Sequence, residues 1–183
     1  MLIRINKILL TFVAVSFVMI LTACSENADN QGDRNVNNKP EKERLEEANR
    51  YLLKQERETI DEYIKTLGGS FVETGTGLRY RIVSQGDNDL IKTGDIVVME
   101  YELRLLNGDL VYSSENEGIK VFRVGHGGVE SGLEEAVLHL HNGDVAEVII
   151  PSYLAHGLIG DGNGIPPRST LVYKLKIIDK QIN

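Results

Sequence analysis

The chain has 183 residues, a formal net charge of −7 and 42% hydrophobic residues. It is acidic and carries no cluster of Lys and Arg, so we exclude nucleic acid as a partner, because nucleic-acid binding requires a basic surface. The length suits one domain preceded by a helical lead-in.

Residues 1–23 have the pattern of a signal peptide. A short basic region is followed by an apolar run that is shorter than a typical transmembrane helix. The run Leu21-Thr22-Ala23-Cys24 resembles the lipobox of bacterial lipoproteins, in which the cysteine is lipidated. Cys24 is the single cysteine of the sequence and has no disulfide partner within the chain. We therefore expect an N-terminal lipid anchor that holds the protein to a membrane of the bacterial cell envelope, facing the periplasm or the exterior. An ordinary secretory signal with a spare thiol is the alternative.

Residues 24–39 are rich in Asn, Asp and Glu, which predicts a disordered tether. Residues 40–69 predict a helix that begins near Pro40 and ends at Gly68-Gly69. Its apolar stripe breaks near the charged Glu56 and consists of Leu45, Ala48, Leu52, Ile60, Tyr63 and Leu67. The stripe packs either on the chain's own domain, which we favour, or on a second copy, which would give a homodimer.

Alternating apolar and polar residues predict strands over residues 77–84, 95–106, 119–124, 145–150 and 170–178. Asn107-Gly108 predicts a tight turn after the second of these strands. Tyr101 and Tyr173 fall on the apolar faces of their strands, so we expect both to point into the core.

Between the strands, residues Leu133, Ala136, Val137 and Leu140 repeat at helical spacing. Ser131 and Glu134 predict a capping box at the start of this helix, and Asn142-Gly143 predicts its end. The pattern indicates an α+β fold over residues 70–183, in which an antiparallel sheet wraps against one short helix.

The runs VGHGGVESGLEEAVLHLHNGD, IIPSYLAHG and IPPRSTLVYKL resemble the FKBP family of peptidyl-prolyl cis-trans isomerases, and the resemblance extends over residues 77–179. It implies a twisted antiparallel sheet curled around one short helix, with an apolar pocket between them. It also implies an enzyme that assists folding by isomerising X–Pro bonds of unfolded or partly folded proteins. The N-terminal features are similar to the lipoprotein branch of the family, including its gliding-motility-associated type.

The resemblance also assigns the site, position by position. The main-chain N–H of Glu130 corresponds to the group that binds a substrate carbonyl. The implied catalytic residues are Tyr101, Glu130, His156 and Tyr173. The implied substrate pocket consists of Val111, Tyr112, Phe122, Val129, Leu133 and Ile165, with Ile165 reaching in from a loop that acts as a lid.

Several positions depart from the family pattern. Val111-Tyr112 replaces a Phe-Asp pair, so an aromatic residue and the pocket carboxylate are missing there. Lys120 stands where the family often has an aromatic residue, and His156 replaces a loop tyrosine. His156 would then donate a hydrogen bond from its imidazole. These departures leave two alternatives open: a non-catalytic FKBP-like binding or scaffold lipoprotein, and a dimeric chaperone.

Rotation about an X–Pro bond needs no metal and no cofactor, and none is expected. The run Asp161-Gly162-Asn163-Gly164 is similar to a calcium loop, but it lacks the later bidentate Glu.

Overall fold

The computed structural model describes residues 40–87 and 89–181. The predicted signal peptide, the predicted tether and Cys24 lie outside the described residues. The described elements, in chain order, are α2 (Glu41–Leu67), β1 (Val72–Glu73), β2 (Arg79–Ser84), β3 (Ile96–Leu105), β4 (Leu110–Ser113), α3 (Ser114–Glu117), β5 (Lys120–Arg123), α4 (Ser131–Val137), β6 (Val145–Ile150), the 3-10 helix η1 (Ser152–Leu154) and β7 (Leu171–Gln181).

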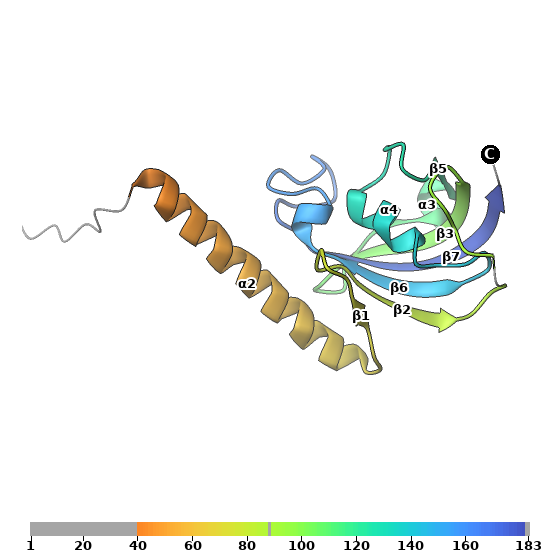
Figure 1. Cartoon of the computed structure of the whole chain (residues 1–183), viewed down its shortest axis with the longest axis horizontal. Coiled ribbons are helices and arrows are strands. Elements are labelled where there is room, and N and C mark those ends of the chain that lie inside the picture. Colours follow the sequence, from red (N-terminus) through yellow and green to blue (C-terminus); the bar gives the residue numbers. More distant parts are fainter. Residues whose placement is uncertain (1–39, 88, 182–183) are drawn as a thin grey trace, which may run out of the picture. The chain divides into compact units, whose positions relative to one another are not determined.

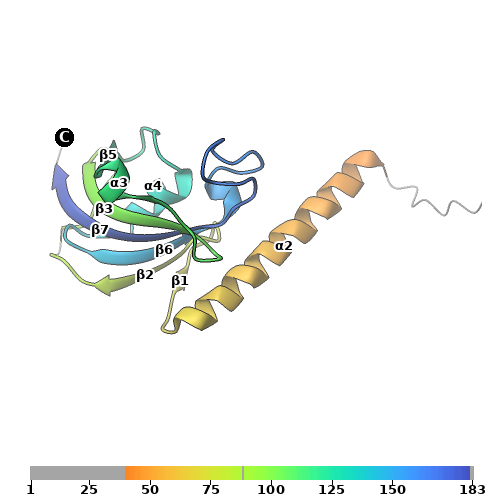
Figure 2. The same cartoon turned by 180° about the vertical axis from the view of Figure 1, so that it is seen from behind.

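The strands form a seven-stranded antiparallel sheet in the order β1-β2-β6-β7-β3-β4. Strand β5 pairs with the first half of β3, and β4 pairs with its second half. Figures 1 and 2 show the sheet curling around the short helix α4. The predicted α+β architecture is therefore confirmed, and the predicted turn at Asn107-Gly108 joins β3 to β4.

The main core lies between α4 and the inner face of the sheet, and strand alternation selects its members. Strand β7 buries Leu171, Tyr173, Leu175 and Ile177, while α4 buries Leu133, Ala136 and Val137. Tyr101 and Tyr173 are 8% and 0% exposed, so the prediction that both point inward is confirmed. Each large apolar side chain buried in this way stabilises the fold by about 1.5–3 kcal/mol.

Helix α4 begins and ends differently from the prediction. Its N-cap residue is Glu130, with no side-chain capping bond, and its C-cap is Leu138. The predicted capping box is wrong because its two side chains have other partners: the Ser131 hydroxyl donates to the carbonyl of Leu154, and the Glu134 carboxylate accepts from the amide of Gly127. These bonds tie both neighbouring loops to the start of α4.

Helix α2 packs on the outer face of the same sheet through its C-terminal half. Ile60 is 2% exposed and contacts Ile149 and Val172, with Tyr63, Ile64, Leu67, Phe71 and Leu106 around them. Leu45, at the other end of the predicted stripe, is 64% exposed. The expected packing of the helix on its own domain is thus confirmed for the second half of the stripe only.

Polar contacts also hold α2 in place. The Glu56 carboxylate accepts hydrogen bonds from the Ser152 amide at 2.7 Å, the Ser152 hydroxyl at 2.9 Å and the Thr170 hydroxyl at 2.7 Å. The buried Arg79 guanidinium lies 3.1 Å from both Asp61 and Glu73. In the strand predicted over residues 77–84, alternation puts Arg79 on the polar face, which would face solvent in a half-buried strand. Arg79 is buried instead, because α2 covers that face. No helix in the described part of the chain is long and apolar enough to span a membrane.

Candidate functional site

A pocket of about 620 Å³ opens at the N-terminus of α4. Strands β3, β4 and β5, the segment that leads into α4, and the loop between η1 and β7, residues 155–170, all contribute to its lining. Its lining residues are Leu103, Tyr112, Lys120, Gly128, Val129, Glu130, Ser131, Ala155, His156 and Asp161. Four predicted site residues are among them: Tyr112, Val129, Glu130 and His156.

The Glu130 side chain is a buried carboxylate in the wall of this pocket, with 7% of its surface exposed. Its Oε1 accepts a hydrogen bond of 2.9 Å from the Tyr173 hydroxyl and lies 3.3 Å from His156 Nε2. Its Oε2 is buried and has no hydrogen-bond partner among the described residues. The family resemblance implied a role only for the main-chain N–H of Glu130, so this buried carboxylate was not expected from the sequence.

Tyr173 is held as a hydrogen-bond donor. Burial, together with the negative charge of Glu130 and the hydrogen bond to it, raises the pKa of Tyr173 well above its usual value. The hydroxyl therefore stays protonated across the physiological pH range. The Glu130 carboxylate joins Tyr173 to His156 through its single oxygen Oε1, although these three residues lie far apart in the sequence.

An aromatic wall stands beside this carboxylate. The rings of Tyr101 and Tyr173 have centroids 5.9 Å apart and are tilted by 46°. The Lys120 ammonium lies 4.9 Å from the centroid of the Tyr101 ring and 5.8 Å from that of Tyr173. Burial, and the negative charges of Glu117 and Glu130, raise the pKa of Tyr101. Lys120 thus places a cation on the aromatic rings where the family often has a further aromatic side chain.

Tyr112 and Asp161 fix the loop that closes the pocket. The Tyr112 hydroxyl donates to Asp161 Oδ2, and Asp161 Oδ1 accepts from the amides of Asn163 at 2.9 Å and Ile165 at 2.8 Å. Partial burial acts to raise the pKa of Asp161, but these hydrogen bonds outweigh it and lower the pKa to about 2. Val111-Tyr112 supplies no carboxylate to the pocket, as expected, but Asp161 from the loop and Glu130 from the start of α4 line it instead.

The loop depends on glycine at one place in particular. Gly160 has a φ of +71°, and a Cβ there would lie 2.2 Å from the carbonyl oxygen of Ile165. Only glycine at this position allows the two segments of the loop, around Gly160 and Ile165, to approach this closely. The close approach holds Ile165, which is 3% exposed, in the core behind the pocket.

The other predicted pocket residues lie behind the lining. Phe122, Leu133 and Ile165 belong to the main core, and Val111 packs against it. Leu133 is completely buried, so it supports the pocket from below. The roles of these residues, and the hydrogen bond expected from His156 to a substrate, remain predictions. Among the described residues, no group of three His, Cys, Asp or Glu side chains has the arrangement of a metal site.

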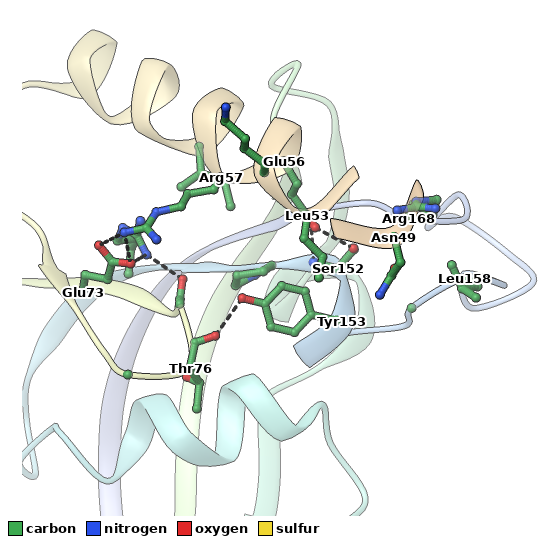
Figure 3. Close-up of a pocket in the computed structure, with 17 residues that line it drawn as sticks. Asn49, Leu53, Glu56, Arg57, Glu73, Thr76, Ser152, Tyr153, Leu158 and Arg168 are labelled. Carbon is green, nitrogen blue, oxygen red and sulfur yellow. Dashed lines mark hydrogen bonds and ion pairs between the residues drawn. The ribbon is translucent and has the colours of Figure 1, made fainter. Parts of the chain in front are cut away.

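A second hollow of about 640 Å³ lies between α2, η1 and the strand β1, and Figure 3 shows its lining. Most of its labelled polar groups are already paired. Arg57 lies 2.9 Å from Glu73, Glu56 bonds Ser152, and the Tyr153 hydroxyl donates to the carbonyl of Thr76 at 2.7 Å. Because these pairs satisfy the groups that would recognise a ligand, we take the pocket at α4 as the candidate site.

The fold and this pocket define a class of domain in which a curled antiparallel sheet holds a ligand pocket against one short helix. A family model described as FKBP-type peptidyl-prolyl cis-trans isomerase matches residues 88–178. FK506-binding protein 2 of Dictyostelium discoideum is 35% identical over 105 residues, covering 56% of this chain and 76% of that relative. The chain belongs to the FKBP-type peptidyl-prolyl cis-trans isomerase family.

Two further comparisons concern bacterial proteins. The probable FKBP-type peptidyl-prolyl cis-trans isomerase FkpA of Neisseria meningitidis serogroup B is 39% identical over 106 residues, covering 57% of this chain. This chain spans 38% of the length of that relative. The crystal structure of FkpA from Escherichia coli superposes with a TM-score of 0.61 at 28% identity, covering 77% of this chain and 68% of the other.

Proposed function

We propose that the protein is a peptidyl-prolyl cis-trans isomerase that acts on proline-containing segments of unfolded or partly folded proteins in the cell envelope. The observation that carries this proposal is the pocket at the N-terminus of α4, in a chain of this family. Tyr101, Tyr173, Phe122 and Leu133 lie in the main core, against which the apolar lining residues Tyr112, Val129 and Ala155 pack.

The chemistry follows from the nature of the X–Pro bond. Resonance opposes rotation with a barrier of about 18–20 kcal/mol, and uncatalysed exchange takes tens of seconds or longer. Transfer of the imide from water to an apolar slot weakens its polar resonance form and favours the twisted transition state. No backbone carbonyl of the described residues accepts from the Glu130 N–H, so this donor is available to hold a substrate carbonyl during rotation.

A non-catalytic binding module is the second candidate, and specific residues favour it. Val111 and Lys120 stand where the family often has aromatic residues, and Glu130 adds a carboxylate to the wall. A pocket with these polar groups desolvates an imide less completely than an aromatic one. Under this alternative, the protein holds proline-containing segments without accelerating their isomerisation.

The expected location rests on the N-terminal sequence. The run Leu21-Thr22-Ala23-Cys24 supports lipidation at Cys24 after removal of residues 1–23, and residues 24–39 would tether the domain to the membrane. Labelling with a radioactive fatty acid tests this directly. Incorporation into the wild-type chain and its loss in Cys24→Ala are expected. Equal incorporation into both chains would exclude Cys24 as the attachment site, and no incorporation into the wild type would exclude the anchor.

Exchange spectroscopy of a Leu-Pro peptide by NMR tests the activity. We expect the full chain, kept in solution with a mild detergent, to accelerate cis–trans exchange, and Tyr101→Ala to reduce kcat/KM at least tenfold because it opens the pocket wall. Circular dichroism checks that the variant is folded. A folded wild-type chain that binds the peptide without accelerating exchange would establish the binding module instead.

The oligomeric state distinguishes the dimeric chaperone from the two other proposed functions, the isomerase and the binding module. The N-terminal half of α2 exposes Leu45 and Tyr51, which are 64% and 60% exposed and available to a second copy. Analytical ultracentrifugation of the full chain and of a chain lacking residues 40–53 is the test. A dimer that becomes a monomer on deletion supports homodimerisation through this helix, whereas a monomeric full chain excludes it.

A further inference from the structure

The Glu130 carboxylate is an unusual component of a pocket expected to be apolar. Its side chain is more than nine-tenths buried and lines the pocket, yet its Oε2 has no hydrogen-bond partner among the described residues. Buried polar atoms are nearly always paired, so a buried carboxylate oxygen without a partner requires an explanation. The oxygen belongs to a side chain in the pocket wall, where a ligand can supply the missing donor.

The geometry of the carboxylate favours such a ligand. Oε1 accepts from the Tyr173 hydroxyl and lies within hydrogen-bond distance of His156, so these two residues anchor one oxygen and leave the other to a third donor. The terminal torsion of a Glu side chain is soft, so Oε2 can turn toward a donor in the pocket while Oε1 keeps its partners. An ionised carboxylate is an acceptor only, so the ligand must bring an N–H or an O–H group.

The charged side chains of the pocket indicate whether the ligand group that donates to Glu130 is charged or neutral. Asp161, with its pKa lowered to about 2, is ionised at neutral pH and also lines the pocket. Lys120 is the cation of the lining, and its ammonium rests on the rings of Tyr101 and Tyr173. The structure pairs no described carboxylate with that ammonium. Two carboxylates thus face one lysine, and the pocket favours a cation over a neutral or acidic group.

We propose that Glu130 is a specificity-determining residue that binds the Lys or Arg side chain of a basic residue adjacent to the substrate proline. This inference rests on the proposed prolyl isomerase function. The ammonium or guanidinium group completes the hydrogen bonding of Oε2, while the aliphatic stem packs on the apolar side of the pocket. The preferred clients are therefore protein segments in which a basic residue flanks a proline.

The test compares lysine with norleucine, which has the same stem without the ammonium group. Four short peptides carry one or the other directly before or directly after the proline, and NMR exchange gives kcat/KM with the full chain in detergent. In at least one of the two positions we expect a preference for lysine of roughly tenfold, the size of a charge-assisted hydrogen bond in a partly open site. The preference should fall to about one in Glu130→Gln.

Two variants keep the result specific. Glu117→Gln removes an exposed carboxylate near Tyr101 that does not line the pocket, and the lysine preference should remain. Lys120→Met removes the competing cation but keeps the stem, and the lysine preference should increase. A wild-type preference near one at both positions, or an undiminished preference in Glu130→Gln, overturns the proposal.

A failure of the isomerase activity is distinguishable from a failure of this inference. If no peptide exchanges faster with the wild-type chain, the activity proposal fails, and titration of the same peptides into isotope-labelled protein decides the role of Glu130. Tighter binding of a lysine peptide, lost in Glu130→Gln, supports the proposal. Equal affinities for the lysine and norleucine peptides, or no binding of any peptide, overturn it.

Discussion

Two carboxylates on opposite sides of the sheet are satisfied to different degrees. On the outer side, both oxygens of Glu56 accept hydrogen bonds, two from Ser152 and one from Thr170. On the inner side, one oxygen of Glu130 has two partners and the other has none. The first carboxylate joins α2 to η1 and to the start of β7, whereas the second lies in the wall of an open pocket.

This difference indicates that Glu56 contributes to the stability of the fold, whereas Glu130 contributes to ligand binding. A carboxylate whose hydrogen bonds are complete stabilises the fold, and its loss leaves buried donors without acceptors. A buried carboxylate whose hydrogen bonds are incomplete costs stability and persists where function uses it. Substitution at the two positions should therefore have opposite signatures, one in stability and the other in substrate preference.

The largest effect is expected from Glu56→Ala. The variant leaves the Ser152 amide and the hydroxyls of Ser152 and Thr170 without their acceptor, so the free energy of unfolding should fall by about 3 kcal/mol. Urea unfolding followed by circular dichroism measures it. The substrate preference assigned to Glu130 should not change, because Glu56 does not line the pocket at α4.

Glu58→Ala is the matched control on the same helix. Glu58 is exposed and lies 3.8 Å from Lys54 in a surface ion pair, which contributes less than about 0.5 kcal/mol. If the two variants lost the same stability, helix propensity or net charge would explain the loss at Glu56, and its hydrogen bonds would not.

A smaller effect is expected from Glu130→Gln, which keeps the shape of the side chain. The amide oxygen still accepts from Tyr173 and His156, and the buried charge is removed, so the free energy of unfolding should change by less than about 1 kcal/mol. The same unfolding experiment measures it. A loss of 3 kcal/mol would show that Glu130 is as completely bonded as Glu56, and the contrast between them would disappear.

The sequence predicted most of the fold, since strand alternation and helical spacing are local patterns. Tyr101, Tyr173 and Leu133 were placed correctly in the core by these patterns alone. Glu56 looked like a break in the apolar stripe of the helix, because its partners Ser152 and Thr170 lie about a hundred residues away. Arg79 looked like a solvent-facing residue for the same reason, since nothing local shows that α2 covers it.

The candidate site was predicted in part. The resemblance placed Glu130 and His156 at the pocket, but it could not reveal that they share a hydrogen bond, because 26 residues separate them. Asp161 was considered for a calcium loop, and the structure gives it a different role in fixing the loop over the pocket. Its hydrogen bonds to the amides of Asn163 and Ile165 are local, so the Asp-Gly-Asn-Gly run was sufficient to predict an Asx turn there.

The smallest effect on stability is expected at Asp161, which can be compared with both Glu56 and Glu130. Asp161 lines the pocket, as Glu130 does, but both of its oxygens accept hydrogen bonds, as those of Glu56 do. A substitution at Asp161 therefore separates the effect of complete hydrogen bonding from the effect of position in the pocket. Its pKa falls from 3.8 to about 2 on folding, so it stabilises the fold above pH 4. That contribution is lost as the pH falls through about 2, and below this pH the carboxylate is protonated in both states.

Asp161→Asn removes the titration and keeps an oxygen that accepts from the amides of Asn163 and Ile165. The wild-type chain should therefore be more stable than the variant at pH 5, and most of this advantage should be lost at pH 2. Because the side chain is largely solvated, screening keeps the difference below about 1 kcal/mol. Thermal unfolding of both chains at pH 5, 3.5 and 2 measures it. A difference that is independent of pH would mean that the charge of Asp161 contributes nothing, and that its neutral hydrogen bonds alone hold the loop over the pocket.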